Sequence, residues 1–171
     1  MNPGEISKEN LFLLIKIGFN RLSIGFQSLD PELLKTLSRT HNPDDCFKTF
    51  ENARVARFDN ISIDMMYNIP GQSVKRWIDD LKTLIKLGCD HIALFPLTAE
   101  KGTPFYNQVQ SGEIQLPDSH FEEDMFIQGS QFLTENKFTQ YEVAHFAKPW
   151  KKCTHNLHYW NLESYLAFGP S

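Results

Sequence analysis

Short apolar runs alternate with longer segments of helical spacing along the first hundred residues. The apolar runs cover residues 20–26, 60–66 and 91–95, and each has the length of a buried strand. In the segments between them, apolar residues recur every three or four positions, as on one face of an amphipathic helix. This alternation predicts an α/β fold, with a parallel sheet and right-handed helical crossovers.

Capping residues mark where the helices of this region begin. Serine, aspartate or asparagine precedes each helical segment, proline follows in two of them, and glycine ends two. The pattern predicts helices over residues 7–18, 31–38, 43–55 and 73–88.

The pattern changes after residue 100. Gly112 closes a short polar piece with helical character, and a further helix is predicted from Asp118 to about Asn136. Residues 141–147 alternate like a strand or an extended edge. Residues 149–171 are rich in aromatic residues and histidine and show no clear period.

Two of the predicted strands stop at a single polar side chain. The strand over residues 21–26 ends at Gln27, and the strand over residues 60–63 ends at Asp64. In a parallel sheet or barrel, both side chains would lie at the carboxyl ends of neighbouring strands, where such folds bind ligands. The sequence therefore predicts half of a binding site at this edge.

Composition excludes several classes of protein. The 171 residues are one domain in size, and 41% hydrophobic with 22% charged residues indicates a globular, soluble chain. No apolar run approaches the roughly 20 residues of a membrane helix, so no membrane span is expected. The net charge of −4 argues against a broad nucleic-acid-binding face.

Three widely spaced cysteines, Cys46, Cys89 and Cys153, limit the redox chemistry. An odd count without paired spacing disfavours both a disulfide framework and a metal or iron–sulfur site built by this chain alone. A reducing, cytoplasmic location is expected.

Seven stretches occur in the same order as in one known family and span nearly the whole chain. They are Asn2-Pro3-Gly4, residues 20–28, Leu37-Ser38-Arg39-Thr40-His41, residues 63–72, residues 97–105, Gln140-Tyr141-Glu142 and residues 153–160. Together they resemble the coproporphyrinogen-oxidase-like branch of the radical S-adenosylmethionine (SAM) superfamily. The His-Asn-x-x-Tyr-Trp block at 155–160 is similar to the HemW group of haem chaperones in that branch.

The resemblance implies a partial (β/α) TIM-type barrel with SAM lying across the strand ends. Residues 1–100 would be the C-terminal half of that barrel, and residues 101–171 a truncated HemW-like α+β extension. By position, Gln27, Arg39 and Asp64 match the family's SAM-contacting residues. Their chemistry suits the ligand, because an amide both donates and accepts, a guanidinium pairs with a carboxylate, and a carboxylate accepts from hydroxyls or an amine.

The same resemblance implies a [4Fe–4S] cluster held by a Cys-x3-Cys-x2-Cys loop, which this sequence lacks. We therefore expect no cluster, no catalytic residue and no radical activity from this chain alone. The family's motifs are cut at both ends, so we expect an internal fragment, with a chain supplying the missing N-terminal half as a candidate partner. An unpaired strand edge predicts low stability without such a partner.

His155 is the candidate haem ligand, because a histidine ring nitrogen can bind haem iron. Tyr159 and Trp160 would offer flat apolar surface to a porphyrin. The competing interpretation is an aromatic segment packed on the barrel, with His155 only hydrogen-bonded. Cys153 is a rival ligand, and His158 a weaker one.

Three further sets of polar residues bear on these interpretations. Lys148, Lys151 and Lys152 could meet porphyrin propionates. Three histidines look structural or exposed, and two acidic groups look like solvated helix faces. They are His91, His120 and His145, and the groups Asp79-Asp80 and Glu122-Glu123-Asp124.

The function expected is therefore that of a HemW-like radical SAM fragment in haem or porphyrin metabolism, with SAM and haem as small-molecule partners. Two alternatives stay open. The parent could be an oxygen-independent coproporphyrinogen III oxidase, or the chain could be a non-catalytic scaffold domain that binds neither ligand.

Overall fold

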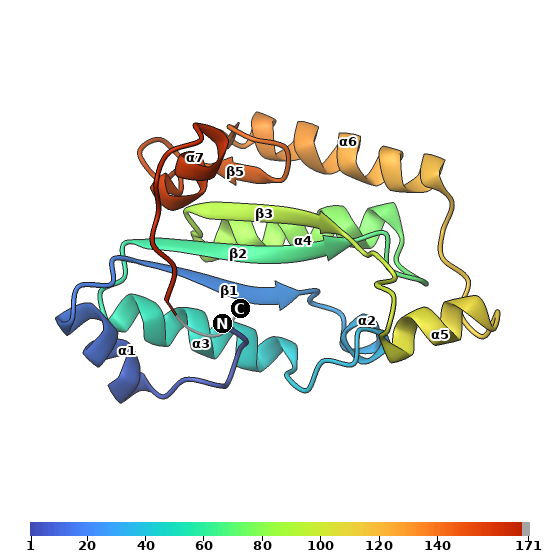
Figure 1. Ribbon diagram of the computed structural model, residues 1–171, viewed down its shortest axis with the longest axis horizontal. Coiled ribbons are helices and arrows are strands. Elements are labelled where there is room, and N and C mark those ends of the chain that lie inside the picture. Colours follow the sequence, from blue (N-terminus) through green and yellow to red (C-terminus); the bar gives the residue numbers. More distant parts are fainter. Residues whose placement is uncertain (169–171) are drawn as a thin grey trace.

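A five-stranded mixed sheet forms the centre of the protein in a computed structural model, which describes residues 1–168 (Figure 1). The strand order is β1-β2-β3-β5-β4. The first three strands pair in parallel, as the alternation predicted, whereas β5 runs antiparallel to both β3 and β4. The strands are β1 (Arg21–Gln27), β2 (Asn60–Tyr67), β3 (His91–Pro96), β4 (Thr139–Gln140) and β5 (His145–Ala147).

The predicted capping residues begin the helices. The side chains of Ser7, Asp30, Asn42 and Ser73 each accept a hydrogen bond from a backbone N–H in the first turn, and Asn42 forms a reciprocal capping box with Asp45. The helices are α1 (Lys8–Lys16), α2 (Pro31–Thr36), α3 (Pro43–Val55), α4 (Val74–Leu87), α5 (Pro104–Gln110), α6 (Ser119–Glu135) and α7 (Thr154–Trp160).

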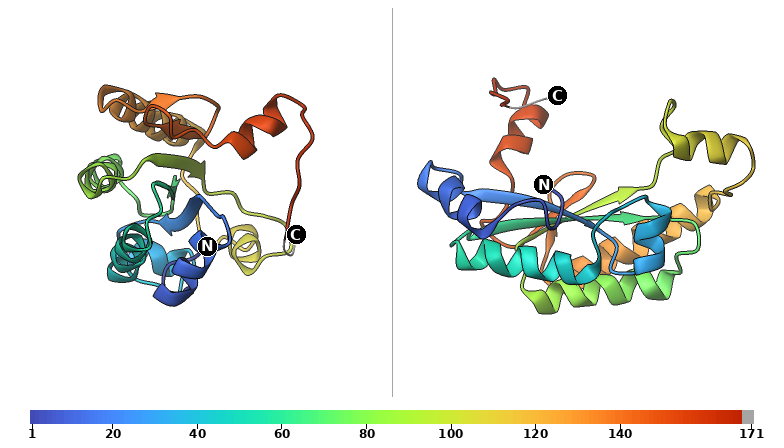
Figure 2. Two further views of the ribbon diagram at one scale, coloured as in Figure 1. Left: turned by 90° about the vertical axis from the view of Figure 1, so that its left-hand side faces the viewer. Right: turned by 90° about the horizontal axis from the view of Figure 1, so that it is seen from below.

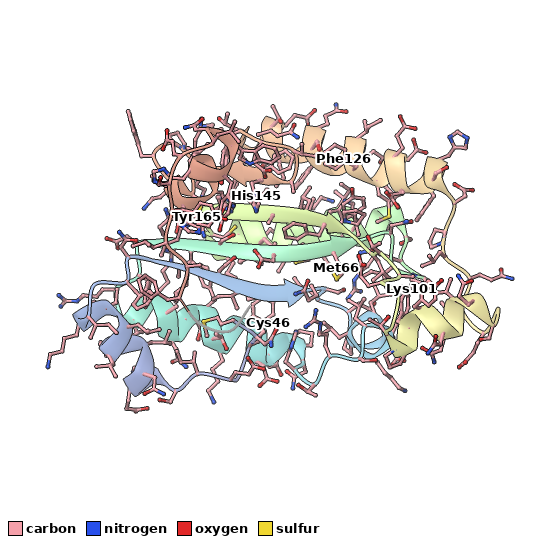
Figure 3. All side chains as sticks on the ribbon, in the orientation of Figure 1. Cys46, Met66, Lys101, Phe126, His145 and Tyr165 are labelled. Atoms are coloured by element: carbon pink, nitrogen blue, oxygen red, sulfur yellow. The ribbon has the colours of Figure 1, made fainter. Side chains whose placement is uncertain are left out.

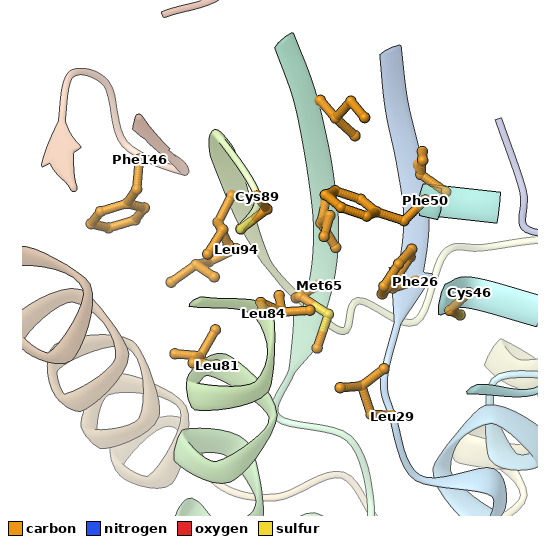
Figure 4. Packing of buried hydrophobic residues seen from close by; sticks show 14 of the residues in the cluster. Phe26, Leu29, Cys46, Phe50, Met65, Leu81, Leu84, Cys89, Leu94 and Phe146 are labelled. Carbon is orange, nitrogen blue, oxygen red and sulfur yellow. The ribbon is translucent and has the colours of Figure 1, made fainter. Parts of the chain in front are cut away.

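The core lies on one face of the sheet, which α3, α4 and α6 cover (Figure 2). Alternate strand residues point to this face, as in any pleated strand. Figure 4 shows Phe26 and Met65 from the strands packing with Phe50 and Leu84 from the helices. Burial of this face supplies the main driving force for folding.

The opposite face of the sheet is polar. Arg21 and Ser23 on β1, and Ser62 and Asp64 on β2, alternate with the core residues. Helix α7 lies on this side, away from α3 and α4 (Figure 2). The polar face is therefore the one on which a ligand could lie against the strands.

The free edge of β1 is partly covered by the first residue of the chain. The Met1 ammonium donates to the Ser23 carbonyl at 2.9 Å, and the Gly25 N–H donates to the Met1 carbonyl at 3.0 Å. The remaining backbone groups of this edge are a template for pairing with another strand.

Two predicted elements differ from the observed ones. Residues 141–147 are not one strand, because the Glu142 carboxylate accepts from the Ala144 N–H at 3.0 Å and turns the chain between β4 and β5. The segment without a clear period contains α7, which the sequence pattern did not indicate. The division at residue 100 stays a prediction, and β5 joins residues of the second part to the sheet of the first.

Candidate functional site

Asp64 lies inside β2 rather than at its end, because the strand continues to Tyr67. The register pairs Asp64 with Gly25 on one side and Ala93 on the other. Its Oδ1 accepts a hydrogen bond from the Ser23 hydroxyl at 2.7 Å. The carboxylate is thus fixed on the polar face, where its remaining lone pairs can accept from a ligand.

Gln27 ends β1 at a bulge and has a left-handed backbone, with φ 67°. Its side-chain amide folds back over Gly25, since a Cβ atom at Gly25 would lie 2.5 Å from the Gln27 Nε2. Glycine at this position therefore makes room for the amide. The register places Gln27 one step beyond Asp64 on the neighbouring strand, so the two predicted residues share one end of the sheet.

Arg39 follows α2 and lines a cavity of about 300 Å³ with Met66, from the end of β2, and Phe105 of α5. Its Nε is buried and has no hydrogen-bond partner within residues 1–168. A guanidinium nitrogen in this state is suited to a carboxylate ligand, which would satisfy it. Gln27 and Arg39 thus lie at the carboxyl ends of the strands, whereas Asp64 lies further inside the sheet, on its polar face.

A chain of hydrogen bonds runs from Asp64 across the polar face. The Ser62 hydroxyl lies 3.4 Å from Asp64 Oδ1 and 2.8 Å from His91 Nδ1. The other nitrogen of His91, Nε2, lies 2.8 Å from the Tyr141 hydroxyl, which accepts from the Cys153 N–H at 3.2 Å. Sequence reasoning missed this series of hydrogen bonds, although strand alternation places Ser62 on the same face as Asp64.

One assignment of protons satisfies every hydrogen bond in this series. Tyr141 accepts from the Cys153 N–H and donates to His91 Nε2, so His91 carries its proton on Nδ1 and donates to Ser62. Ser62 then donates to the Asp64 carboxylate. Each donor points toward the negative charge, an arrangement in which successive hydrogen bonds strengthen one another.

His91 stays neutral at physiological pH. Burial, the Arg21 cation and His145 together lower the pKa of His91 to about 2. The expectation that His91 is structural agrees with its position, fully buried between the sheet and the C-terminal segment.

The expectation of a solvated acidic face was wrong for Asp80, which is 3% exposed. Its Oδ2 accepts from the Leu29 N–H at 3.1 Å and the Ser28 hydroxyl at 3.4 Å, and its Oδ1 lies 3.3 Å from Arg76 Nε. Burial raises the pKa of this carboxyl. Asp80 thereby ties α4 to the loop that follows Gln27. The adjacent Asp79 side chain is 41% exposed and pairs with Lys75 at the surface, as expected for a solvated helix face.

His155 lies at the opposite end of the strands from Gln27. It lines a cavity of about 410 Å³ together with residues from the start of β1 and β2, including Arg21 and Asn60. In Figure 3, Tyr165 of the same C-terminal segment lies toward the strand starts, whereas Met66 and Lys101 lie toward the strand ends. The structure therefore does not bring the candidate haem ligand to the candidate SAM residues.

The His155 ring is exposed and surrounded by aromatic side chains. Its Nε2 lies 3.1 Å from the Tyr159 hydroxyl, and its ring meets those of Tyr159 and Tyr165 edge-on. The segment around it exposes an unusual amount of apolar surface, which commonly marks a binding region. The exposed residues are Trp150, Tyr159, Trp160, Leu162, Tyr165, Leu166 and Phe168.

The rival ligands are engaged elsewhere. Cys153 is 6% exposed and its thiol donates to the Asn156 side chain at 3.3 Å. His158 Nδ1 pairs with the Glu163 carboxylate. The Lys148 Nζ lies 5.4 Å from the centre of the Phe138 ring, away from the cavity that Lys151 and Lys152 line.

The three cysteines do not fit an iron–sulfur cluster. Cys46 lies on α3, Cys89 before β3 and Cys153 before α7, and all three are buried. Burial raises the thiol pKa of both Cys46 and Cys89 to about 12, so neither offers a thiolate. Residues 1–168 also contain no group of three His, Cys, Asp or Glu side chains placed to hold a metal ion.

Comparison with known proteins gives the family. A profile described as the radical SAM superfamily matches residues 1–84. The heme chaperone HemW of Bacillus subtilis is 38% identical over 168 residues, which are 98% of this chain. The chain belongs to the radical SAM superfamily. The resemblance inferred from the seven stretches is thereby confirmed.

Other proteins of similar sequence or structure support the same family assignment. The mouse protein named radical S-adenosyl methionine domain-containing protein 1, mitochondrial, is 38% identical over 99% of this chain. The structure of the radical SAM enzyme coproporphyrinogen III oxidase (HemN) from Escherichia coli superposes with a TM-score of 0.76 at 26% identity, over 94% of this chain and 36% of that one. This likeness confirms the partial barrel.

The radical SAM chain spans only part of its relatives. It covers 44% of the Bacillus subtilis protein and 38% of the mouse protein. Within residues 1–168, no helix is both long enough and apolar enough to cross a membrane.

Proposed function

We propose that this chain is the part of a HemW-like radical SAM protein that carries a haem-binding segment and one side of the SAM site. The observation that carries the proposal is the exposed His155 imidazole among exposed aromatic side chains. The relationship with HemW over 98% of the chain supports it.

The haem-binding segment comprises residues 150–168. Its aromatic and aliphatic side chains are a suitable surface for a flat apolar ring, since covering them removes apolar area from water. A ring nitrogen of His155 is the proposed iron ligand. Ligation through Nε2 would replace its hydrogen bond with the Tyr159 hydroxyl.

SAM would be held by Gln27, Arg39 and Asp64. The unpartnered Arg39 Nε suits the carboxylate of the ligand, and the Asp64 carboxylate suits its hydroxyls or amine. In this superfamily SAM, when bound beside a reduced [4Fe–4S] cluster, supplies a radical. The cysteines of this chain do not fit that cluster, so we propose that this chain alone lacks radical activity and depends on a partner segment or chain that carries it.

The test is a titration of the purified chain with haemin, followed by absorbance, with His155→Ala as the variant. We expect a spectrum that saturates at about one equivalent in the wild type and is lost in the variant. His120→Ala, an exposed histidine on α6, is the matched control and should bind like the wild type. Non-saturating, identical curves for all three would contradict the proposal.

A second candidate is a part of a coproporphyrinogen III oxidase, which the TM-score of 0.76 with the Escherichia coli enzyme favours. The test is conversion of coproporphyrinogen by the full-length protein, since a haem chaperone would leave it unchanged. A scaffold domain would bind neither haem nor SAM.

A reducing, cytoplasmic location is part of the first proposal and is supported by three cysteines without disulfides.

A further inference from the structure

A positively charged cavity lies at the start of β1 and β2, on the polar face of the sheet. It has a volume of about 410 Å³ and is lined by Asn20, Arg21 and Asn60 from the strand starts and by residues 150–155 from the C-terminal segment. Arg21, Lys151 and Lys152 contribute three cations, and no aspartate or glutamate of the described chain lines it. The whole protein has a net charge of −4, so this concentration of positive charge is local.

The Arg21 side chain has unused hydrogen-bonding capacity. Its Nε is buried without a hydrogen-bond partner in the part of the chain that the structure describes, and it forms no ion pair there. A buried guanidinium nitrogen without a partner is costly unless a ligand satisfies it. Its planar fork matches a carboxylate in geometry and charge.

The walls of the cavity are held in place by contacts on both sides. The Asn60 side chain donates to the Lys151 carbonyl at 3.3 Å, and Lys151 Nζ donates to the Asp59 carbonyl. The Lys152 ammonium lies 5.5 Å from the centre of the Tyr141 ring. These contacts fix the C-terminal segment over the strand starts and keep its cations together.

His155 joins this cavity to a second, less charged one. The second cavity, about 370 Å³, is lined by His155, His158, Ser164, Tyr165 and Leu166. The imidazole therefore stands between a basic side and a side with aromatic and aliphatic surface. A ligand that has an apolar ring and acidic arms could use both sides at once.

We propose that the cavity around Arg21 is a carboxylate-binding site that takes the propionate arms of a porphyrin whose ring lies against the exposed aromatic residues. This inference rests on the proposed haem-binding function for its ligand and assigns a specific role to Arg21. A cavity of this size accepts carboxylate arms and leaves the ring outside. Arg21 forms the charge-assisted hydrogen bonds, and Lys151 and Lys152 add to the attraction.

The experiment compares iron-free protoporphyrin IX with its dimethyl ester, because the two differ only in the carboxylates and neither needs an iron ligand. Binding is followed by quenching of tryptophan fluorescence in the wild type and in Arg21→Met. We expect the wild type to bind the diacid roughly tenfold more tightly than the ester, and Arg21→Met to lose this preference while binding the ester unchanged. Arg57 is an exposed arginine outside the cavity, so Arg57→Met is the control and should keep the preference for the diacid.

Equal affinities of the wild type for the diacid and the ester, or an unchanged preference in Arg21→Met, would overturn the inference. If thermal unfolding shows that Arg21→Met does not fold, Lys152→Met gives the same comparison and should reduce the preference. The haemin titration with His155→Ala is independent of these results. If His155→Ala binds haemin like the wild type but the preference for the diacid depends on Arg21, only iron ligation by His155 is overturned. If no porphyrin binds saturably, both the proposed haem binding and the carboxylate site are overturned.

Discussion

The Tyr141 hydroxyl lies 2.8 Å from His91 Nε2, at the point where the C-terminal segment meets the sheet. Because the same hydroxyl accepts from the Cys153 N–H, Tyr141 holds the start of the proposed haem-binding segment against β3. Tyr141→Phe should lower the free energy of unfolding by about 1–3 kcal/mol, since it leaves buried polar groups unsatisfied. Hydrogen exchange should also be faster at the Cys153 amide.

Tyr106→Phe is the matched control for this change. The Tyr106 hydroxyl makes no hydrogen bond within residues 1–168, so its loss should alter stability by less than about 0.5 kcal/mol. Equal effects of the two substitutions on the Cys153 amide would show that Tyr141 does not anchor the segment.

His91 should make the protein less stable in acid. Its pKa is about 2 in the folded protein and about 6.5 in the unfolded chain, so below pH of about 6.5 only the unfolded chain takes up the proton. The free energy of unfolding should therefore fall by up to about 1.4 kcal/mol per pH unit as the pH decreases below that value. Urea unfolding at several pH values measures this slope.

His91→Gln should reduce the dependence of the unfolding free energy on pH by up to about 1.4 kcal/mol per pH unit, because glutamine keeps a polar side chain but does not titrate. His120→Gln, at an exposed site, should leave the slope as it is. A slope that is the same in His91→Gln and the wild type would mean that another group is responsible.

Asp80 should contribute strongly to the stability of the fold, whereas the adjacent Asp79 should contribute little. Asp80→Ala removes the acceptor for the Leu29 N–H and one of the two carboxylates that pair with Arg76, and we expect a loss of about 3 kcal/mol in denaturant unfolding. Asp79→Ala, at a partly exposed site with two lysine partners, should cost less than about 1 kcal/mol. Similar losses for both would argue against a specific role of the buried carboxylate.

Asp64 should matter for SAM rather than for the fold alone. We expect Asp64→Asn to weaken SAM binding at least about tenfold, because the amide loses the charge and half of the acceptor capacity. The measurement is calorimetric titration of a chimera in which the N-terminal part of the Bacillus subtilis relative precedes this chain. Asp59→Asn, an exposed site, serves as the control, and an unchanged affinity in Asp64→Asn would exclude a direct contact.

The partly covered edge of β1 should limit the stability of the isolated chain. We expect a broad or low-temperature melt, or self-association in size-exclusion chromatography, because much of this edge is unpaired. The chimera described above should melt at a higher temperature and be monomeric. A cooperative, monomeric melt of the isolated chain well above room temperature would contradict this expectation.

Local signals made the order of the elements predictable. Asp30-Pro31 and Asn42-Pro43 mark helix starts through side-chain hydrogen bonds within one turn, and the observed helices begin there. The apolar runs at β1, β2 and β3 reflect burial of the core face, which depends on the period of two along a strand. These features need no knowledge of distant contacts.

Other features depend on contacts between distant residues and could not be predicted. The burial of Asp80 follows from the position of Leu29, which precedes it by about fifty residues. Helix α7 is seven residues long and has no side-chain cap, so neither period nor capping residue marks it. His91 and Tyr141 could be placed on their elements, but their meeting depends on β5 joining the sheet.

The length of β1 sets the distance between the two proposed ligands. The strand is seven residues long, which corresponds to about 20 Å from Arg21 to Gln27. Molecules held at its two ends would not touch and would not compete for the same atoms. The porphyrin proposed for one end could therefore be exchanged while the SAM proposed for the other end stays in place. The series of hydrogen bonds from Asp64 to Cys153 lies between the two ends.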